Sequence, residues 1–125
     1  MNPKMIAYWV TTGLLSFALF GAGAAKLMAA PQLVENLTRI GLPTYFMQIL
    51  GPWEVLAPVA LLAPKFPLVK EWAYAGAFFA MSGAFAAHVL AGDAIAEAVP
   101  SAGLAALTVA SYLLRPASRR LPLGA

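Results

Sequence analysis

The fold is decided by the stretch Gly51-Pro52-Trp53-Glu54-Val55-Leu56-Ala57-Pro58. It lies inside an apolar run, residues 45–62, which is long enough to cross a lipid bilayer with a little tilt or local thinning. Glu54 is the charged residue of that run. Because a charge inside the bilayer is costly, an acidic residue at this depth predicts a functional site with a nearby partner.

Two prolines strengthen this prediction. Pro58 has no N–H to donate to the carbonyl of Glu54, and Pro52 leaves the carbonyl of Gln48 without its helical donor in the same way. Backbone carbonyls freed like this persist in a membrane only where they face protein or water. We therefore expect Glu54 to point into the interior of a helix bundle.

The composition indicates an integral membrane protein. Hydrophobic residues make up 62% of the 125 residues and the mean hydropathy is +0.78, whereas charged residues make up only 10%. The absence of cysteine excludes a disulfide framework, a thiolate metal site and a dithiol relay. The net charge of +3 is modest and sits at loop ends, so we expect no nucleic-acid binding.

The apolar runs predict an all-α fold, a bundle of four transmembrane helices that forms a single domain over residues 1–125. The fourth run is short enough that its ends would thin the bilayer. The four predicted spans cover residues of about 5–28, 45–62, 72–90 and 100–115.

Small residues at helical spacing mark one face of the third span. They are Gly76, Ala80, Gly83 and Ala87. Faces of this kind let helices approach closely in membranes, so we expect tight helix packing there.

A short interfacial helix is predicted over residues 31–41, between the first and second spans. Its apolar positions recur at helical spacing at Leu33, Val34, Leu37 and Ile40. Pro31 suits its first turn, Gly41 suits the position after its last residue, and Glu35 and Arg39 are spaced for an ion pair one turn apart. The pattern fits a helix on the membrane surface, whether a lid or a plain connector.

The basic residues predict the orientation. With four spans, both termini lie on one side of the membrane, together with Lys4, Lys65, Lys70, Arg115, Arg119 and Arg120. The opposite loops carry Arg39 among Glu35, Asp93 and Glu97, and the last two of these we expect to be solvated loop charges. The positive-inside rule therefore predicts cytoplasmic termini, in the inner membrane of a bacterium.

Three polar residues are predicted to share the outer half of the membrane. With a rise of about 1.5 Å per residue, Glu54 lies roughly 12 Å below the outer end of its helix, and Lys26 and His88 lie within one turn of theirs. A weak internal repeat, residues 21–29 against 83–91, also aligns Lys26 with His88. A carboxylate, an amine and an imidazole around one low-dielectric space form a candidate acid/base set.

Each of these residues also has an ordinary structural interpretation. Lys26 can extend to the interface, His88 can lie at the membrane surface, and Glu54 can lock two helices together. A metal site is not expected, because one histidine without cysteines gives too few ligands. The candidate lining of the pocket, which equally fits an aromatic belt, is Trp53, Gln48, Tyr45 and Tyr112.

Several motifs resemble the DoxX-like membrane proteins. They are Gly-Ala-Gly-Ala-Ala-Lys-Leu (residues 21–27), Gly-Leu-Pro (41–43), Leu-Gly-Pro-Trp-Glu-Val-Leu (50–56), Lys-Glu-Trp-Ala-Tyr-Ala-Gly (70–76), and Gly83-Ala84 through His88 to Gly92-Asp93. The resemblance implies a four-helix transmembrane bundle, with the lysine and glutamate of the family at Lys26 and Glu54. Its broader membership includes a subunit of a thiosulfate:quinone oxidoreductase, membrane partners of redox enzymes and a receptor-assembly chaperone. A thiol-based redox role would need cysteines, which this chain lacks.

Three functions follow as hypotheses. The first is a small membrane enzyme, or a quinone-linked oxidoreductase subunit, that binds a lipophilic molecule; a quinone is the candidate cofactor, Glu54 the acid/base, Lys26 its charge partner and His88 a proton relay. The second is a non-catalytic assembly or docking partner, of a second copy or of a membrane enzyme. The third is a proton-coupled transporter, which the clustering of polar groups toward one leaflet disfavours.

Overall fold

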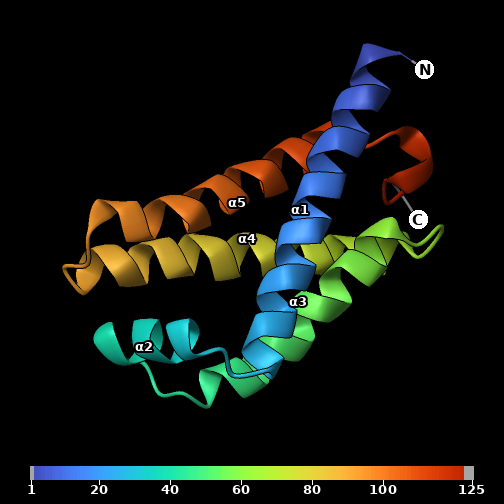
Figure 1. Ribbon diagram of the computed structural model, residues 1–125. Helices are drawn as coiled ribbons and strands as arrows, with labels where there is room; N and C mark the ends of the chain where they lie inside the picture. Colours follow the sequence, from blue (N-terminus) through green and yellow to red (C-terminus); the bar gives the residue numbers. More distant parts are fainter. Residues whose placement is uncertain (1, 123–125) are drawn as a thin grey trace.

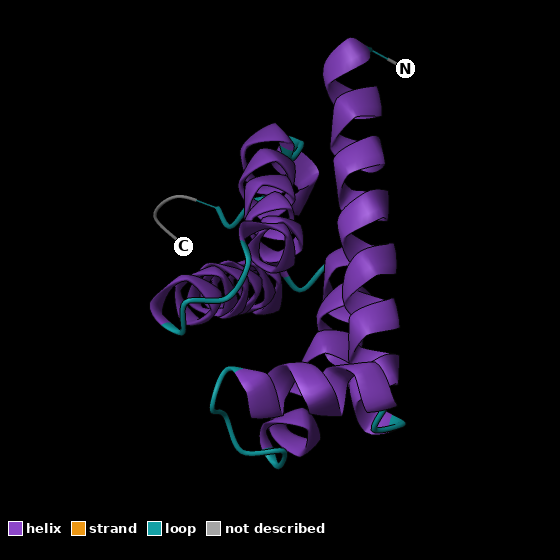
Figure 2. Ribbon diagram, turned by 60° about the vertical axis from the view of Figure 1, so that its left-hand side comes forward, coloured by secondary structure: helices purple, strands orange, loops and turns teal. Residues whose placement is uncertain are grey.

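The computed structural model describes residues 2–122, and within them every regular element is helical (Figure 2). Three of the helices are long and apolar enough to cross a membrane, and α3 is a shorter apolar helix of 17 residues. The predicted four-span bundle is confirmed. The elements are α1 (Pro3–Leu27), α2 (Pro31–Arg39), α3 (Phe46–Leu62), α4 (Pro67–Leu90), α5 (Ile95–Leu114) and the 3₁₀ turn η1 (Ala117–Arg119).

The helix α5 is longer than the sequence pattern predicted. It begins at Ile95, five residues before Pro100, and the proline lies inside the helix. The residues before Pro100 include several alanines, which are strong helix formers, and the proline removes only one backbone donor from the ladder. With 20 residues, α5 is long enough to span, so the expected short fourth span is not found. The shortest apolar helix is α3.

The short helix α2, between the first and second apolar helices, has the predicted ends. Pro31 stands in its first turn, and Gly41 follows the C-cap residue Ile40 with a φ of +84°, a conformation that glycine adopts without strain. None of its side chains is fully buried. It therefore depends on contacts at its ends and edges for its position.

The bundle is built from two helical hairpins (Figure 1). In the first hairpin, α1 packs along α3 and α2 connects them; in the second, α4 packs along α5. Contacts of α1 with α5 and of α3 with α4 join the hairpins. Both termini and the α3–α4 turn lie at one end, here called the terminal end, and α2 and the α4–α5 turn lie at the other, the α2 end.

The closest helix approach is between α1 and α3 rather than on α4. A Cβ added to Gly23 would lie 2.8 Å from the carbonyl oxygen of Gly51 and from atoms of Val55, whereas one added to Gly76 or Gly83 would meet nothing within 4 Å. The prediction of tight packing on the small-residue face of α4 is therefore wrong for this chain. Neither of these glycines of α4 has a neighbouring helix close enough to require a glycine.

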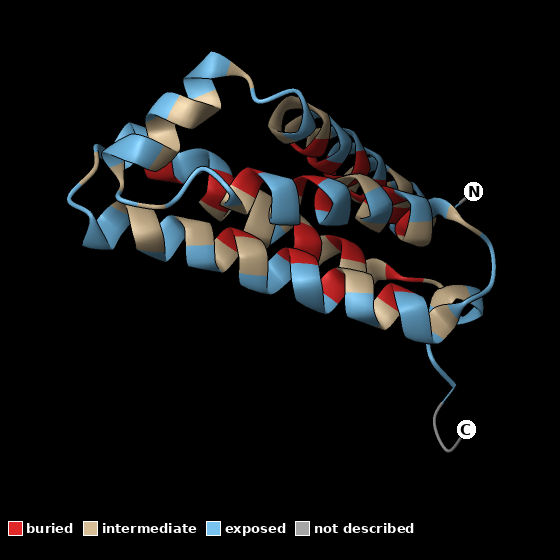
Figure 3. Cartoon of the chain, turned by 90° about the horizontal axis from the view of Figure 1, so that it is seen from below, coloured by how far each residue is buried: buried red, intermediate tan, exposed pale blue. Residues whose placement is uncertain are grey.

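The core combines apolar and hydrogen-bonded side chains. The buried residues lie along the sides of the helices that face one another (Figure 3). The hydroxyl of Ser111 on α5 lies 2.6 Å from the hydroxyl of Thr12 on α1 and 2.7 Å from that of Tyr74 on α4. These bonds join three helices where water is excluded. The apolar core consists of Leu15, Leu19, Leu61, Tyr74, Ala77 and Met81.

Two basic residues close the terminal end of α3. The buried ammonium of Lys70 donates to the carbonyl oxygens of Ala60, Ala63 and Lys65. Arg119 donates to the carbonyl of Leu61, with a nitrogen–oxygen distance of 2.9 Å. The last carbonyls of a helix have no donor within the helix, so these two cations satisfy them.

Candidate functional site

The structure brings Lys26 and Glu54 together. The Nζ of Lys26 lies 2.8 Å from the Oε2 of Glu54, and the two side chains are 17% and 6% exposed. The second carboxylate oxygen of Glu54 has no hydrogen-bond partner among residues 2–122. One oxygen is therefore held by the lysine while the other is available to a bound molecule.

The glycines that let α1 approach α3 explain how the pair forms. Lys26 follows Gly23 by three residues and Glu54 follows Gly51 by three, so each charged residue lies on the same helix face as its glycine. Since a side chain at Gly23 would overlap the backbone of α3, the glycine is what allows this contact. The ion pair thus depends on local backbone packing.

The two prolines of α3 face different surroundings. Pro58 is buried against the bundle, whereas Pro52 is exposed on the outside of α3. Pro58 offers no N–H to the carbonyl of Glu54. Glu54 therefore carries both a backbone oxygen without its helical donor and a buried carboxylate. The expectation that Glu54 points inward is met, since the residue is only 5% exposed.

Glu54 borders an apolar cavity of about 660 Å³ between α3 and α4. It is the charged residue among those that line the cavity. Several lining side chains are also exposed on the outside of the bundle, so the cavity is open on the side where lipid would lie. Its walls include Leu50, Trp53, Ala57 and Ala60 from α3 and Trp72, Gly76, Ala80 and Met81 from α4.

The predicted lining residues separate into three places. Trp53 does line the cavity beside Glu54. Tyr45 and Gln48 are exposed near the start of α3 and do not border it. Tyr112 lies at the terminal end, where its hydroxyl donates to Glu71 over 3.0 Å and its ring borders a second cavity of about 340 Å³ between α4 and α5.

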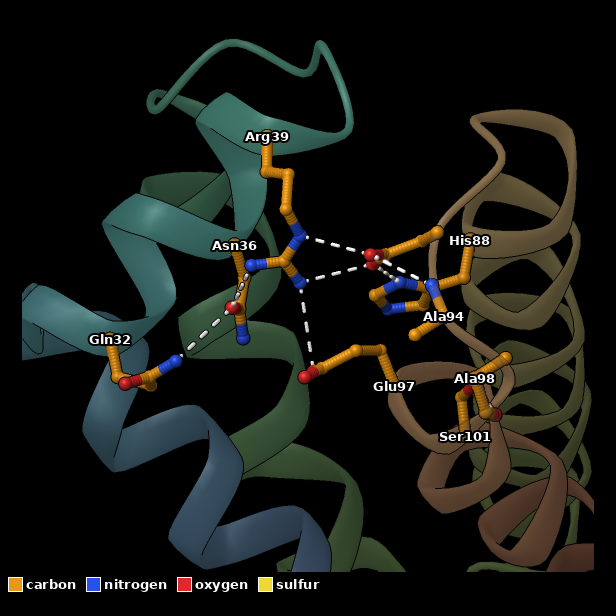
Figure 4. Close-up of polar contacts among 9 residues, drawn as sticks. Gln32, Asn36, Arg39, His88, Ala94, Glu97, Ala98 and Ser101 are labelled. Carbon is orange, nitrogen blue, oxygen red and sulfur yellow. Dashed lines mark hydrogen bonds and ion pairs between the residues drawn. The ribbon is translucent and has the colours of Figure 1, made fainter.

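His88 has a different set of partners from Lys26 and Glu54. Its Nδ1 lies 2.7 Å from the Oδ2 of Asp93 in the α4–α5 turn. Arg39 of α2 binds the same carboxylate, with its Nε and one terminal nitrogen each 3.0 Å from an oxygen of Asp93 (Figure 4). His88 therefore belongs to a cluster at the α2 end, and Arg39 pairs with Asp93 instead of the predicted Glu35.

The expectation of a solvated charge at Asp93 is wrong. Its side chain is 8% exposed and accepts hydrogen bonds from Arg39, His88 and the backbone N–H of Ala94. The Arg39 guanidinium first, and then His88, lower the pKa of the Asp93 carboxyl to about 2, against the opposing effect of burial. Glu97 lies in the first turn of α5, 45% exposed, with its carboxylate 3.6 Å from Arg39.

Sequence reasoning missed one buried ion pair. Arg115 at the end of α5 lies 2.5 Å from the carboxylate of Glu71 in α4, and its guanidinium stacks over the ring of Tyr112 at 3.7 Å. The sequence contained a signal for this pair. In an antiparallel hairpin the end of the fourth span, at Arg115, lies beside the start of the third span, at Glu71.

No group of three or more metal-binding side chains occurs within residues 2–122.

A family model described as the DoxX-like family matches residues 10–111. The match covers both hairpins, with Lys26, Glu54 and His88 inside it. The chain belongs to the DoxX-like family. It is a small integral membrane protein of four apolar helices. Searches of curated proteins and of solved structures found no match.

Proposed function

We propose that this DoxX-like protein binds a lipophilic small molecule in the α3–α4 cavity, with Glu54 as the polar group that contacts it. The observation that carries this proposal is a buried carboxylate beside a large apolar cavity, with one oxygen held by Lys26. Such a combination of an apolar cavity and few polar groups is typical of small-molecule sites. The lateral opening suits a ligand that arrives through the lipid.

A quinone is the candidate ligand by its chemistry. A quinone ring carries carbonyl oxygens that accept hydrogen bonds and, on reduction, protons, while its tail is apolar. Glu54 can exchange a proton with a carbonyl oxygen of the ring, within a wall of apolar side chains, while Lys26 acts as its charge partner by holding the other carboxylate oxygen. In this proposal the protein acts as a small membrane enzyme or as a subunit of a quinone-linked oxidoreductase.

His88 is the proposed proton carrier at the α2 end. With Nδ1 bonded to Asp93, its Nε2 is the nitrogen left to exchange protons with water. In the proposed orientation both termini are cytoplasmic, so the α2 end faces the other side of the membrane. Protons for the Glu54 site would then come from that side.

Two glycines of α4 allow a matched test. Gly76 lines the cavity and Gly83 does not, yet a Cβ added at either position meets no atom within 4 Å. We expect Gly76→Leu to fill part of the cavity and to weaken binding of decylubiquinone at least tenfold, which is about 1.4 kcal/mol. Gly83→Leu should bind as the parent does. Mass spectrometry of molecules that copurify with each variant provides a second measurement.

Equal binding by the parent and both variants would remove the cavity from the proposal. A docking role is the second candidate, since the exposed small residues of α4 leave room for another helix. A protein that copurifies in stoichiometric amount with the parent, is lost with Gly76→Leu and comes without any small molecule, would favour that role.

A further inference from the structure

The two hairpins are held together very differently at the two ends of the molecule. At the terminal end, polar bonds between hairpins run from Ser111 to Thr12 and from Lys70 and Arg119 to the last carbonyls of α3. At the α2 end, within residues 2–122, the hydrogen bonds and ion pairs that join the hairpins all come from Arg39. Figures 1 and 2 show α1 and α5 lying apart there.

Arg39 is well placed to carry this connection alone. Its guanidinium contacts both oxygens of Asp93 at 3.0 Å, a bidentate geometry that is the strongest form of this pair. A third nitrogen donates to the side chain of Asn36, one turn earlier in α2, over 3.1 Å (Figure 4). His88 and the backbone of Ala94 hold the carboxylate from the other side.

The rest of α2 is loosely attached. It has no buried side chain, and a residue with positive φ lies on each side of it, Ala29 at +50° and Gly41 at +84°. Positions like these at the ends of an element can absorb a change of direction. Loss of the Arg39 contact would therefore leave the first hairpin free to move at this end, while the terminal end stays bonded.

We propose that the Arg39–Asp93 contact is a latch that holds the hairpins together at the α2 end and sets the width of the cavity beside Glu54. The cavity lies between the hairpins, because α3 forms one wall and α4 the other. A wider gap at the α2 end separates these walls, and a closed latch brings them together. The effect of the latch on ligand binding rests on the proposed function, whereas the movement of the hairpins does not.

The absence of cysteine makes the movement measurable with introduced spin labels. One pair, at the exposed positions Gln32 and Ala96, reports the separation of α2 from α5. A second pair, at Lys4 and Ser118, reports the terminal end. Pulsed electron–electron double resonance in lipid nanodiscs gives both distance distributions.

Arg39→Gln should move the distance between labels at Gln32 and Ala96 to longer values and broaden its distribution. The distance between labels at Lys4 and Ser118 should stay at the parent value. Glu35→Gln is the matched control, since it also changes one charge on α2 but lies outside every side-chain bond recorded within residues 2–122. This control should leave both distances unchanged.

An Arg39→Gln variant with parent distances would overturn the latch. If that variant does not fold, Arg39→Lys keeps the charge but loses the bidentate fork, and parent distances in this variant would overturn it as well. Decylubiquinone binding separates the two proposals. If the label distance changes in Arg39→Gln but the parent protein does not bind the quinone, the latch is supported and the binding site is not. If the parent binds the quinone but the label distance does not change in Arg39→Gln, the binding site is supported and the latch is not.

Discussion

Two ion pairs of similar composition lie at different places in the bundle, Lys26–Glu54 and Arg115–Glu71. In the second, one oxygen of Glu71 binds Arg115 at 2.5 Å and the other accepts from Tyr112 at 3.0 Å. The guanidinium also stacks over the tyrosine ring. Both oxygens of this carboxylate have a partner, so the pair is suited to holding α4 and α5 together.

The Lys26–Glu54 pair is incomplete by comparison. Glu54 has one recorded bond, through Oε2, and it borders a large apolar cavity. Lys26 lies near the end of α1 on a flexible stem and is the more exposed partner. From this difference we infer two roles. An ion pair whose carboxylate oxygens both have partners stabilises the fold, whereas a pair with one oxygen left beside a cavity is suited to binding a ligand.

The largest expected effect on stability is at Glu71. Glu71→Gln leaves the buried guanidinium of Arg115 without its carboxylate, which should cost about 3 kcal/mol of unfolding free energy. Glu54→Gln should cost less, because the lysine stem can extend to the interface. Chemical denaturation in detergent micelles measures both. Equal losses for the two variants would contradict the contrast between the pairs.

The contact between α1 and α3 gives the next largest effect. Gly23→Ala places a methyl group 2.8 Å from the backbone of α3, which should destabilise the protein by about 2 kcal/mol and separate Lys26 from Glu54. Gly21→Ala adds the same methyl group where no atom lies within 4 Å, so it should not destabilise. Thermal unfolding of the two variants compares them. A destabilised Gly21→Ala would point to a general effect of methyl groups on α1.

The hydroxyl of Ser111 should contribute less to the free energy of unfolding than Glu71 or Gly23. Ser111→Ala removes the bonds to Thr12 and Tyr74 and should cost about 1 kcal/mol, the range for polar contacts between membrane helices. Ser82→Ala is the control, because that hydroxyl bonds only to carbonyls of its own helix. Similar unfolding free energies for the two variants would mean that the hydroxyl cluster adds no stability.

The last effect is a pH dependence at the α2 end. Because the pKa of Asp93 is lowered from 3.8 to about 2, its bonds to Arg39 and His88 stabilise the fold fully above about pH 4, and this contribution is lost as the pH falls toward 2. Asp93→Asn should remove this part of the acid dependence. Unfolding measured from pH 5 to pH 2 tests it, and an identical acid profile in the variant would contradict the assignment.

The sequence was sufficient to predict the four spans, the ends of α2 and the inward position of Glu54, because hydropathy and proline chemistry are local properties. It could not predict which helices pack closely, since Gly23 and Gly76 look alike in sequence but only one meets a neighbouring backbone. The contact of Arg39 with Asp93 was missed for the same reason. It joins residues 54 positions apart, and a spacing rule within one helix favoured Glu35.

The central claim is that Glu54 contacts a lipophilic ligand, and equilibrium binding of decylubiquinone to Glu54→Gln tests it most directly. Glu35→Gln is the control, since it removes an exposed carboxylate that does not line the cavity. We predict that Glu54→Gln weakens binding at least tenfold, about 1.4 kcal/mol, while Glu35→Gln binds as the parent does. Unchanged affinity in folded Glu54→Gln would contradict the account.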